Sequence, residues 1–223
     1  MTWSIEQIDS YIEGLIVNAE QLISESRLLL DGNAYARSFS LAHFAREELA
    51  KVGMLEAAGT RLLAGHKVDF RKLSKRLTDH KEKLRSESAD TMIMAAGAGV
   101  SDLAEIIAKF GSQMVNYRND NKNSSLYVGI IDGVVARPHT LFSREKAERT
   151  LKLAEFSLKE HQAVRNLLGP YAQRAPISIP EVDSSTMDLS SLDIAELGKL
   201  KLQLLSIAES RSKIAEESEK SSG

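Results

Sequence analysis

Apolar side chains recur every three or four positions through two long stretches near the start of the chain, residues 5–30 and 34–63. This is the spacing of residues on one face of an α-helix. In the first stretch the recurring residues are Ile8, Ile12, Leu15, Ile16, Ala19, Leu22, Ile23 and Leu29. Asp31-Gly32-Asn33 ends that stretch, and Gly65 is the expected C-terminal cap of the second. The short connection predicts two antiparallel helices packed against each other.

Most of the remaining sequence also has a helical pattern. Helices are predicted over residues 69–84, 89–117, 143–168 and 192–214, with an interruption of the second at Gly97 and Gly99. The chain has only 4 prolines and 5% aromatic residues, which fits the same class. The predicted fold class is therefore all-α, a helical bundle.

One short segment has a β pattern instead. Leu126–Ile131 and Val134-Val135 are rich in β-branched residues, and the Asp132-Gly133 pair between them is typical of a two-residue hairpin turn. We expect a small β-hairpin inserted between helices. It should pack against them, because two strands alone are marginally stable in water.

The chain divides into four predicted segments. These are a helical domain (1–170), a linker or surface strap rich in proline, serine and aspartate (171–192), an appended amphipathic helix (193–216) and a disordered tail (217–223). The appended helix has Leu197, Leu200, Leu204 and Ile207 at helical spacing. Either the domain or another subunit would cover these side chains, and we expect a homodimer partly for this reason.

Several classes of site are excluded by what the sequence lacks. It has no cysteine, which excludes disulfides, thiolate metal sites and cysteine nucleophiles. It has no His-Glu-x-x-His motif and no glycine-rich phosphate loop, and Glu160-His161 and Asp79-His80 lack di-iron spacing, so no metal and no cofactor are predicted. The N-terminus has no signal-peptide pattern, and there is no apolar run of about 18 residues, so we expect a cytoplasmic protein without a membrane span.

Charge is unevenly distributed, although the net charge is only −2. Residues 67–85 hold eight basic and three acidic side chains, whereas residues 181–223 hold nine acidic and five basic ones. The basic segment is either a surface for the phosphate backbone of a nucleic acid or a solvated helix face.

Adjacent carboxylates interrupt the apolar pattern of the second helix. In Leu41–Lys51, the helical angle predicts that Glu48 lies on the core stripe and Glu47 at its edge. A buried carboxylate needs a partner, and Lys51 is one turn away. The pair is either part of a reactive site or a structural ion pair that holds helices in register.

Three segments, taken in order, carry a family resemblance. They are Ser40–Lys51, Asp79–Lys83, and Arg118 followed by Ser125–Gly129. Over about residues 33–168 the chain resembles the AbiV family of abortive-infection proteins, which belongs to the HEPN group. The resemblance implies a compact helical bundle, often dimeric, that defends bacteria against phage. Many HEPN relatives are metal-independent ribonucleases that use an Arg-x(4–6)-His motif at a dimer cleft.

That motif occurs twice here by spacing alone, as Arg37…His43 and Arg61…His66. About one match is expected by chance in a chain of this composition. Arg37 and His43 are also about 240° apart around a helix, so they do not converge within one protomer. The usual position of the motif lies closer to Arg118, where Asn123 stands in place of the histidine, and asparagine is not a general base near neutral pH.

A divergent site is therefore the hypothesis. Its predicted catalytic residues are His80, Arg118 and Glu48, and its predicted binding residues are Lys51, Lys81, Tyr127, Glu47, Asn119 and Asn123. Structural alternatives stay open: His80 as a helix-end residue bound to a carbonyl, Arg118 as the partner of Glu48, and Tyr127 as half core.

Two functions follow from the resemblance. The first is an abortive-infection effector that acts on RNA or translation as a metal-independent ribonuclease, triggered by a phage or host protein. The second is a noncatalytic HEPN-like module that binds a protein, nucleotide or RNA partner.

Overall fold

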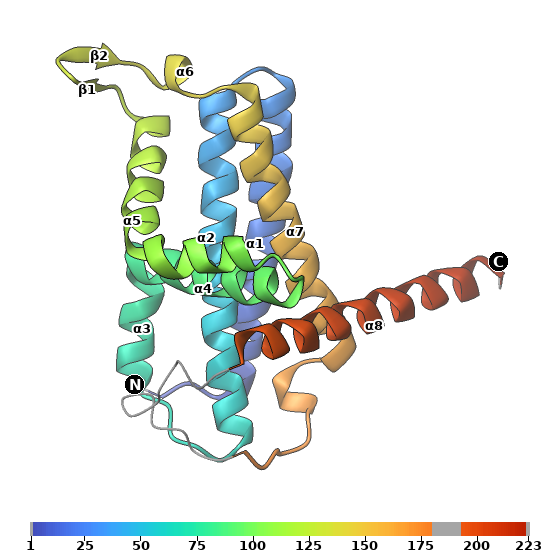
Figure 1. The fold of residues 1–223 in the computed structure, drawn as a ribbon. Helices are drawn as coiled ribbons and strands as arrows, with labels where there is room; N and C mark the ends of the chain where they lie inside the picture. Colours follow the sequence, from blue (N-terminus) through green and yellow to red (C-terminus); the bar gives the residue numbers. More distant parts are fainter. Residues whose placement is uncertain (1, 180–192, 222–223) are drawn as a thin grey trace.

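The computed structural model describes residues 2–179 and 193–221. Its first two helices, α1 (Ile5–Asp31) and α2 (Tyr35–Leu63), lie side by side and antiparallel (Figure 1), as predicted. Ser4 begins α1 with a capping box, in which its hydroxyl accepts a hydrogen bond from the Gln7 amide while the Gln7 side chain accepts one from the Ser4 amide. Gly65, at φ 73°, follows the end of α2.

Helix α7 (Arg144–Leu168) completes the central layer by packing on both α1 and α2. The core between these helices contains the fully buried side chains of Ile12, Leu49, Leu55 and Leu151. Ser143 caps the start of α7 and Gly169, at φ 70°, follows its end, as the sequence predicts. A short 3-10 helix, Tyr171–Gln173, comes next.

The predicted helix 69–84 is two helices, α3 (Phe70–Thr78) and α4 (His80–Gly97), so the prediction of a single element was wrong. Asp79 has an extended backbone (φ −81°, ψ 117°), and its carboxylate accepts hydrogen bonds from the amides of Lys81 and Glu82. It therefore caps the start of α4 and breaks the helix. His80 becomes the first residue of α4 as a result.

Helix α5 (Ser101–Leu126) follows α4 after Gly99, which has a φ of 76°. The predicted interruption near Gly97 and Gly99 is therefore confirmed. Both helices cover a second side of α2, away from α1 and α7 (Figure 1). As a result α2 is packed on two sides, and a carboxylate away from its main apolar stripe can still be buried.

The predicted hairpin is present but shorter. Strands β1 (Gly129–Ile131) and β2 (Val134–Ala136) pair antiparallel through a turn in which Asp132 and Gly133 both have positive φ. It projects away from the bundle (Figure 1), and nearly all its residues are exposed, so the expectation that it packs on the helices was wrong. Tyr127 follows the last residue of α5 as its C-cap and is 68% exposed, not half core. The four-residue helix α6 (Pro138–Leu141) leads into α7.

Helix α8 (Ile194–Ser221) crosses α4 and α7 with its first part and then extends away from the bundle (Figure 1). It continues past the predicted end at Ile214 into the predicted tail. Lys201 forms ion pairs with Asp90 of α4 and Glu160 of α7. Residues 180–192 of the predicted strap, and residues 222–223, lie outside the described residues. No helix in the described part of the chain is long and apolar enough to cross a membrane.

Candidate functional site

Of the two adjacent glutamates of α2, the one predicted at the edge of the core stripe is the more deeply buried. Glu47 is buried, with 3% of its side chain exposed, whereas Glu48 is 20% exposed and bonds to Lys51 at 2.6 Å. The pairing of Glu48 with Lys51 is thus confirmed, and the prediction that Glu48 faces the core was wrong. The reason is that α4 and α5 cover a second side of α2, and Glu47 points toward that side.

Buried Glu47 is the centre of a group of cations and histidines. Its carboxylate lies 2.7 Å from Lys83 Nζ, 2.8 Å from His80 Nδ1, 3.2 Å from Lys122 Nζ and 3.4 Å from His43 Nε2. We call these five residues the Glu47 cluster. Burial acts to raise the pKa of Glu47, but the neighbouring side chains of His43, Lys83 and His80 stabilise the carboxylate more and hold that pKa well below the ordinary value of 4.5. Glu47 is therefore a carboxylate at neutral pH.

His80 is the member of the Glu47 cluster that reaches solvent. Its Nδ1 faces the Glu47 carboxylate, and 56% of its side chain is exposed. A carboxylate bound to one ring nitrogen fixes the orientation of an imidazole and leaves the other nitrogen to exchange protons. This is the arrangement that a general acid or base requires. The alternative prediction, a hydrogen bond between His80 and a backbone carbonyl, was wrong, because the partner of His80 Nδ1 is the Glu47 carboxylate.

Arg118 belongs to a second group. It forms an ion pair with Glu87 of α4, and Arg46 of α2 forms another with the same carboxylate. All three side chains are at most 15% exposed, and we call them the Glu87 cluster. Burial acts to raise the pKa of Glu87, but the two guanidinium groups lower it more. Arg118 is therefore the partner of Glu87 and not of Glu48.

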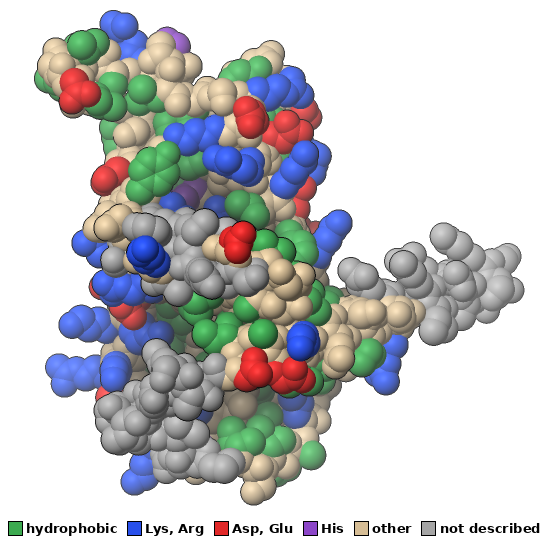
Figure 2. All heavy atoms as spheres, viewed as in Figure 1, with side chains coloured by type: hydrophobic (Ala, Val, Ile, Leu, Met, Phe, Trp, Pro, Cys, Tyr) green, Lys and Arg blue, Asp and Glu red, His purple; other side chains and the backbone are tan. Residues whose placement is uncertain are grey.

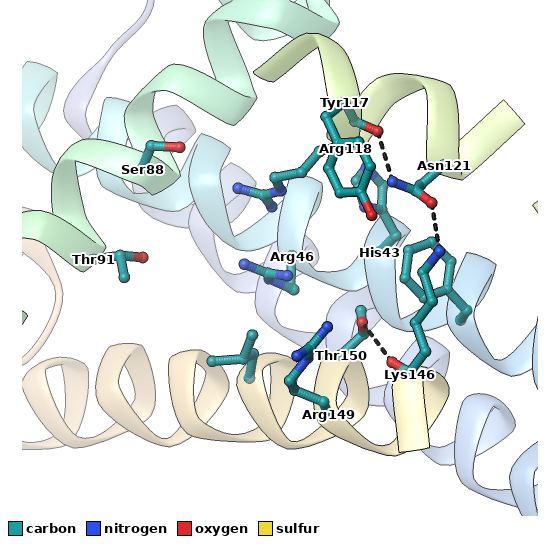
Figure 3. Close-up of a pocket in the computed structure, with 12 residues that line it drawn as sticks. His43, Arg46, Ser88, Thr91, Tyr117, Arg118, Asn121, Lys146, Arg149 and Thr150 are labelled. Atoms are coloured by element: carbon teal, nitrogen blue, oxygen red, sulfur yellow. Dashed lines mark hydrogen bonds between the residues drawn. The ribbon is translucent and has the colours of Figure 1, made fainter. Parts of the chain in front are cut away.

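A cavity of about 470 Å³ lies between α2, α4, α5 and α7 (Figure 3). It is lined by Phe39, His43, Arg46, Ser88, Thr91, Tyr117, Arg118, Asn121, Lys146, Arg149, Thr150 and Leu153. Figure 3 shows the guanidinium groups of Arg46, Arg118 and Arg149 directed into the same space from three helices. Burial lowers the pKa of His43 more than its carboxylate neighbours raise it, so this imidazole is neutral near pH 7.

The predicted site residues therefore do not form one site and are spread over several parts of the molecule. His80 and Glu47 bond to each other, Glu48 and Lys51 form their own pair, and Arg118 lines the cavity. Lys81 is exposed next to His80 on the surface, and Asn119 is half-buried on α5. Asn123 and Tyr127 line a shallow pocket at the base of the hairpin.

Sequence reasoning missed Arg46, Lys83, Glu87 and Lys122, and considered His43 only within the Arg37…His43 spacing. Each is a charged or polar residue within a predicted helix, and such residues more often face solvent than a buried site. No group of three or more histidine, cysteine, aspartate or glutamate side chains within the described residues has the arrangement of a metal site.

A comparison with models of known protein families gives a match. The family model HEPN_AbiV, described as AbiV, matches residues 7–159, from α1 into α7. Helix α8 lies outside the matched span. No curated protein and no solved structure matches this chain.

Proposed function

Because this chain belongs to the AbiV family of HEPN proteins, we propose that it is an abortive-infection effector that cleaves RNA without a metal ion. The observation that carries the proposal is the pairing of solvent-exposed His80 with buried Glu47. We assign His80 as the acid–base residue and Glu47 as the residue that positions it. Arg118, which is bound by a different carboxylate, has no part in this assignment.

The reaction is attack of a ribose 2′-hydroxyl on the adjacent phosphorus. His80 accepts the proton of the hydroxyl as the O2′–P bond forms, and the P–O5′ bond breaks to leave a 2′,3′-cyclic phosphate. The protonated His80, or a water molecule, returns a proton to the leaving O5′. Glu47 stabilises the imidazolium that exists between the two transfers. No metal ion is needed at any step.

The surface around His80 is suited to a phosphate backbone. Exposed cations project from α3 and the start of α4, on the left of the molecule in Figure 2. Arg76 and Arg85 are paired with Glu82. Among the exposed cations of α3 and the start of α4, those without an ion-pair partner in the described residues are Arg71, Lys72, Lys75 and Lys81. These four neutralise phosphates, and their contribution weakens as the salt concentration rises.

The test compares wild type with His80→Ala in phage-infected cells and as purified protein with RNA and a chelator. RNA fragments ending in 2′,3′-cyclic phosphate are expected from wild type, and about 100-fold fewer from the variant. His139→Ala is the matched control, because His139 is exposed on α6, outside the Glu47 cluster. Circular dichroism checks that each variant is folded.

Two results would overturn the assignment. Wild type that produces no cyclic-phosphate ends in either setting excludes the ribonuclease. Equal cleavage by wild type and His80→Ala excludes His80. Phage protection without RNA cleavage would instead support the noncatalytic binding module. The homodimer and the phage or host protein trigger stay predictions, which sedimentation and co-purification from infected cells would measure.

A further inference from the structure

The cavity between α2, α4, α5 and α7 is not used by the reaction assigned to His80, yet its composition is unusual. Its lining includes four cationic side chains, Arg46, Arg118, Lys146 and Arg149, and none of the twelve lining residues is acidic. The nearby carboxylate of Glu87 balances only one of these charges. A concave space with excess positive charge favours an anionic ligand.

The cations are held in place before any ligand arrives. Glu87 forms ion pairs with both Arg46 and Arg118 and so restrains their guanidinium groups. Lys146 donates a hydrogen bond to Asn121 Oδ1 at 2.5 Å, and its ammonium group lies 4.2 Å from the centre of the Phe142 ring. Such preorganisation lowers the entropy that ligand binding costs.

Arg149 differs from the other three. It projects from α7, opposite α5, and has no ion-pair partner among the residues that the structure describes. An arginine presents several donors in a planar fork that matches a phosphate or carboxylate in two-point contacts. Arg149 is therefore available to bind an anion that enters the cavity.

The remaining lining is apolar or aromatic. Phe39 and Leu153 line the cavity, and Tyr117, which is 64% exposed, stands at its edge (Figure 3). The volume of about 470 Å³ is that of a site for a small organic molecule and exceeds what inorganic phosphate needs. An anionic group alone would leave these side chains without a contact.

We propose that this cavity binds a small aromatic phosphomonoester. The phosphate contacts Arg149 together with the guanidinium groups of Arg118 and Arg46, and the aromatic body packs on Tyr117 and Leu153. Two kinds of ligand carry such a phosphate group: a free phosphomonoester, and the 5′-phosphorylated end of an RNA chain.

The test is calorimetric titration of the full-length protein with adenosine 5′-monophosphate and with phenyl phosphate, beside adenosine and inorganic phosphate as ligand controls. We expect the first two to bind, and Arg149→Ala to weaken them about tenfold or more, since a charge-assisted contact is lost. Arg144→Ala, at the exposed start of α7 and outside the cavity lining, should bind as wild type does. Arg149 has no ion-pair partner in the described part of the chain, so its removal should leave the fold intact.

RNA oligonucleotides that differ only in a 5′-phosphate or 5′-hydroxyl distinguish the two sources. Stronger binding of the phosphorylated oligonucleotide, sensitive to Arg149→Ala, assigns the RNA end, whereas binding of the monophosphate alone assigns the free compound. No binding of any phosphomonoester, equal affinity in Arg149→Ala, or inorganic phosphate bound as tightly as phenyl phosphate would each overturn the proposal. Binding of phenyl phosphate involves no RNA cleavage, so the ribonuclease assignment fails or holds separately.

Discussion

Replacing Glu47 by glutamine should destabilise the protein more than its single-atom change suggests. The substitution keeps the shape of the side chain and removes its charge. Lys83 and Lys122, whose side chains are 6% and 7% exposed, would then lie buried without a counter-charge. A buried cation in that position either keeps its charge at a high desolvation cost or gives up its proton.

The magnitude follows from this geometry. Removing one partner of a buried ion pair costs about 3–5 kcal/mol, because the other charge stays buried. In a domain of this size, each kcal/mol corresponds to roughly 2–4 °C in Tm, so the melting temperature should fall by about 6–20 °C. Glu48→Gln, at the neighbouring position, removes only the partly exposed partner of Lys51. It should lower the free energy of unfolding by about 1 kcal/mol or less.

Chemical denaturation at neutral pH measures both variants. The pKa of Glu47 is depressed in the folded protein, so its contribution to the free energy of unfolding is complete above its ordinary value of 4.5 and is lost as the pH falls below that value. The difference between wild type and Glu47→Gln should therefore shrink in acid. Equal destabilisation by Glu47→Gln and Glu48→Gln, or a difference that grows in acid, would refute the reasoning.

Three further substitutions test other buried charges. Glu87→Gln leaves its two arginine partners without a carboxylate and should cost about 3–5 kcal/mol by denaturant titration. Burial alone would lower the pKa of His161, but its ion pair with Glu56 of α2 has the larger effect and raises the pKa above the ordinary value of 6.5. Wild type should thus lose stability relative to His161→Gln as the pH rises through that raised pKa, in melting curves from about pH 6 to 9. Asp9→Asn weakens bonds to Arg165 and two backbone amides and should cost about 2 kcal/mol by the same titration.

Much of the fold could be predicted because local signals agree with it. Periodic apolar residues, together with Ser143 at the start of α7 and Gly169 after its end, predicted α1, α2 and α7 with nearly correct bounds. The Asp132-Gly133 turn was equally informative. The break at Asp79 was missed, because the same residue type also occurs in continuous helices and only its bonds to the amides of α4 distinguish the cap.

The site was less predictable because it depends on which helices cover which side of α2. A periodic stripe identifies one buried side, and Glu48 fitted that stripe better than Glu47 did. The second buried side is created by α4 and α5, whose position no local pattern specifies. His80 was identified from the resemblance, but its bond to Glu47 and the pairing of Arg118 with Glu87 required the tertiary structure.

Helices α4 and α8 meet where neither has a side chain. A Cβ atom added to Gly97 would collide with the backbone of Gly198, and one added to Gly198 would collide with the carbonyl of Ile93. A single methyl group at this crossing would force the two backbones apart and should weaken the attachment of the C-terminal helix. Because α8 lies outside the span matched by the family, Gly198→Ala offers a way to detach this addition while every residue of the shared helices is kept.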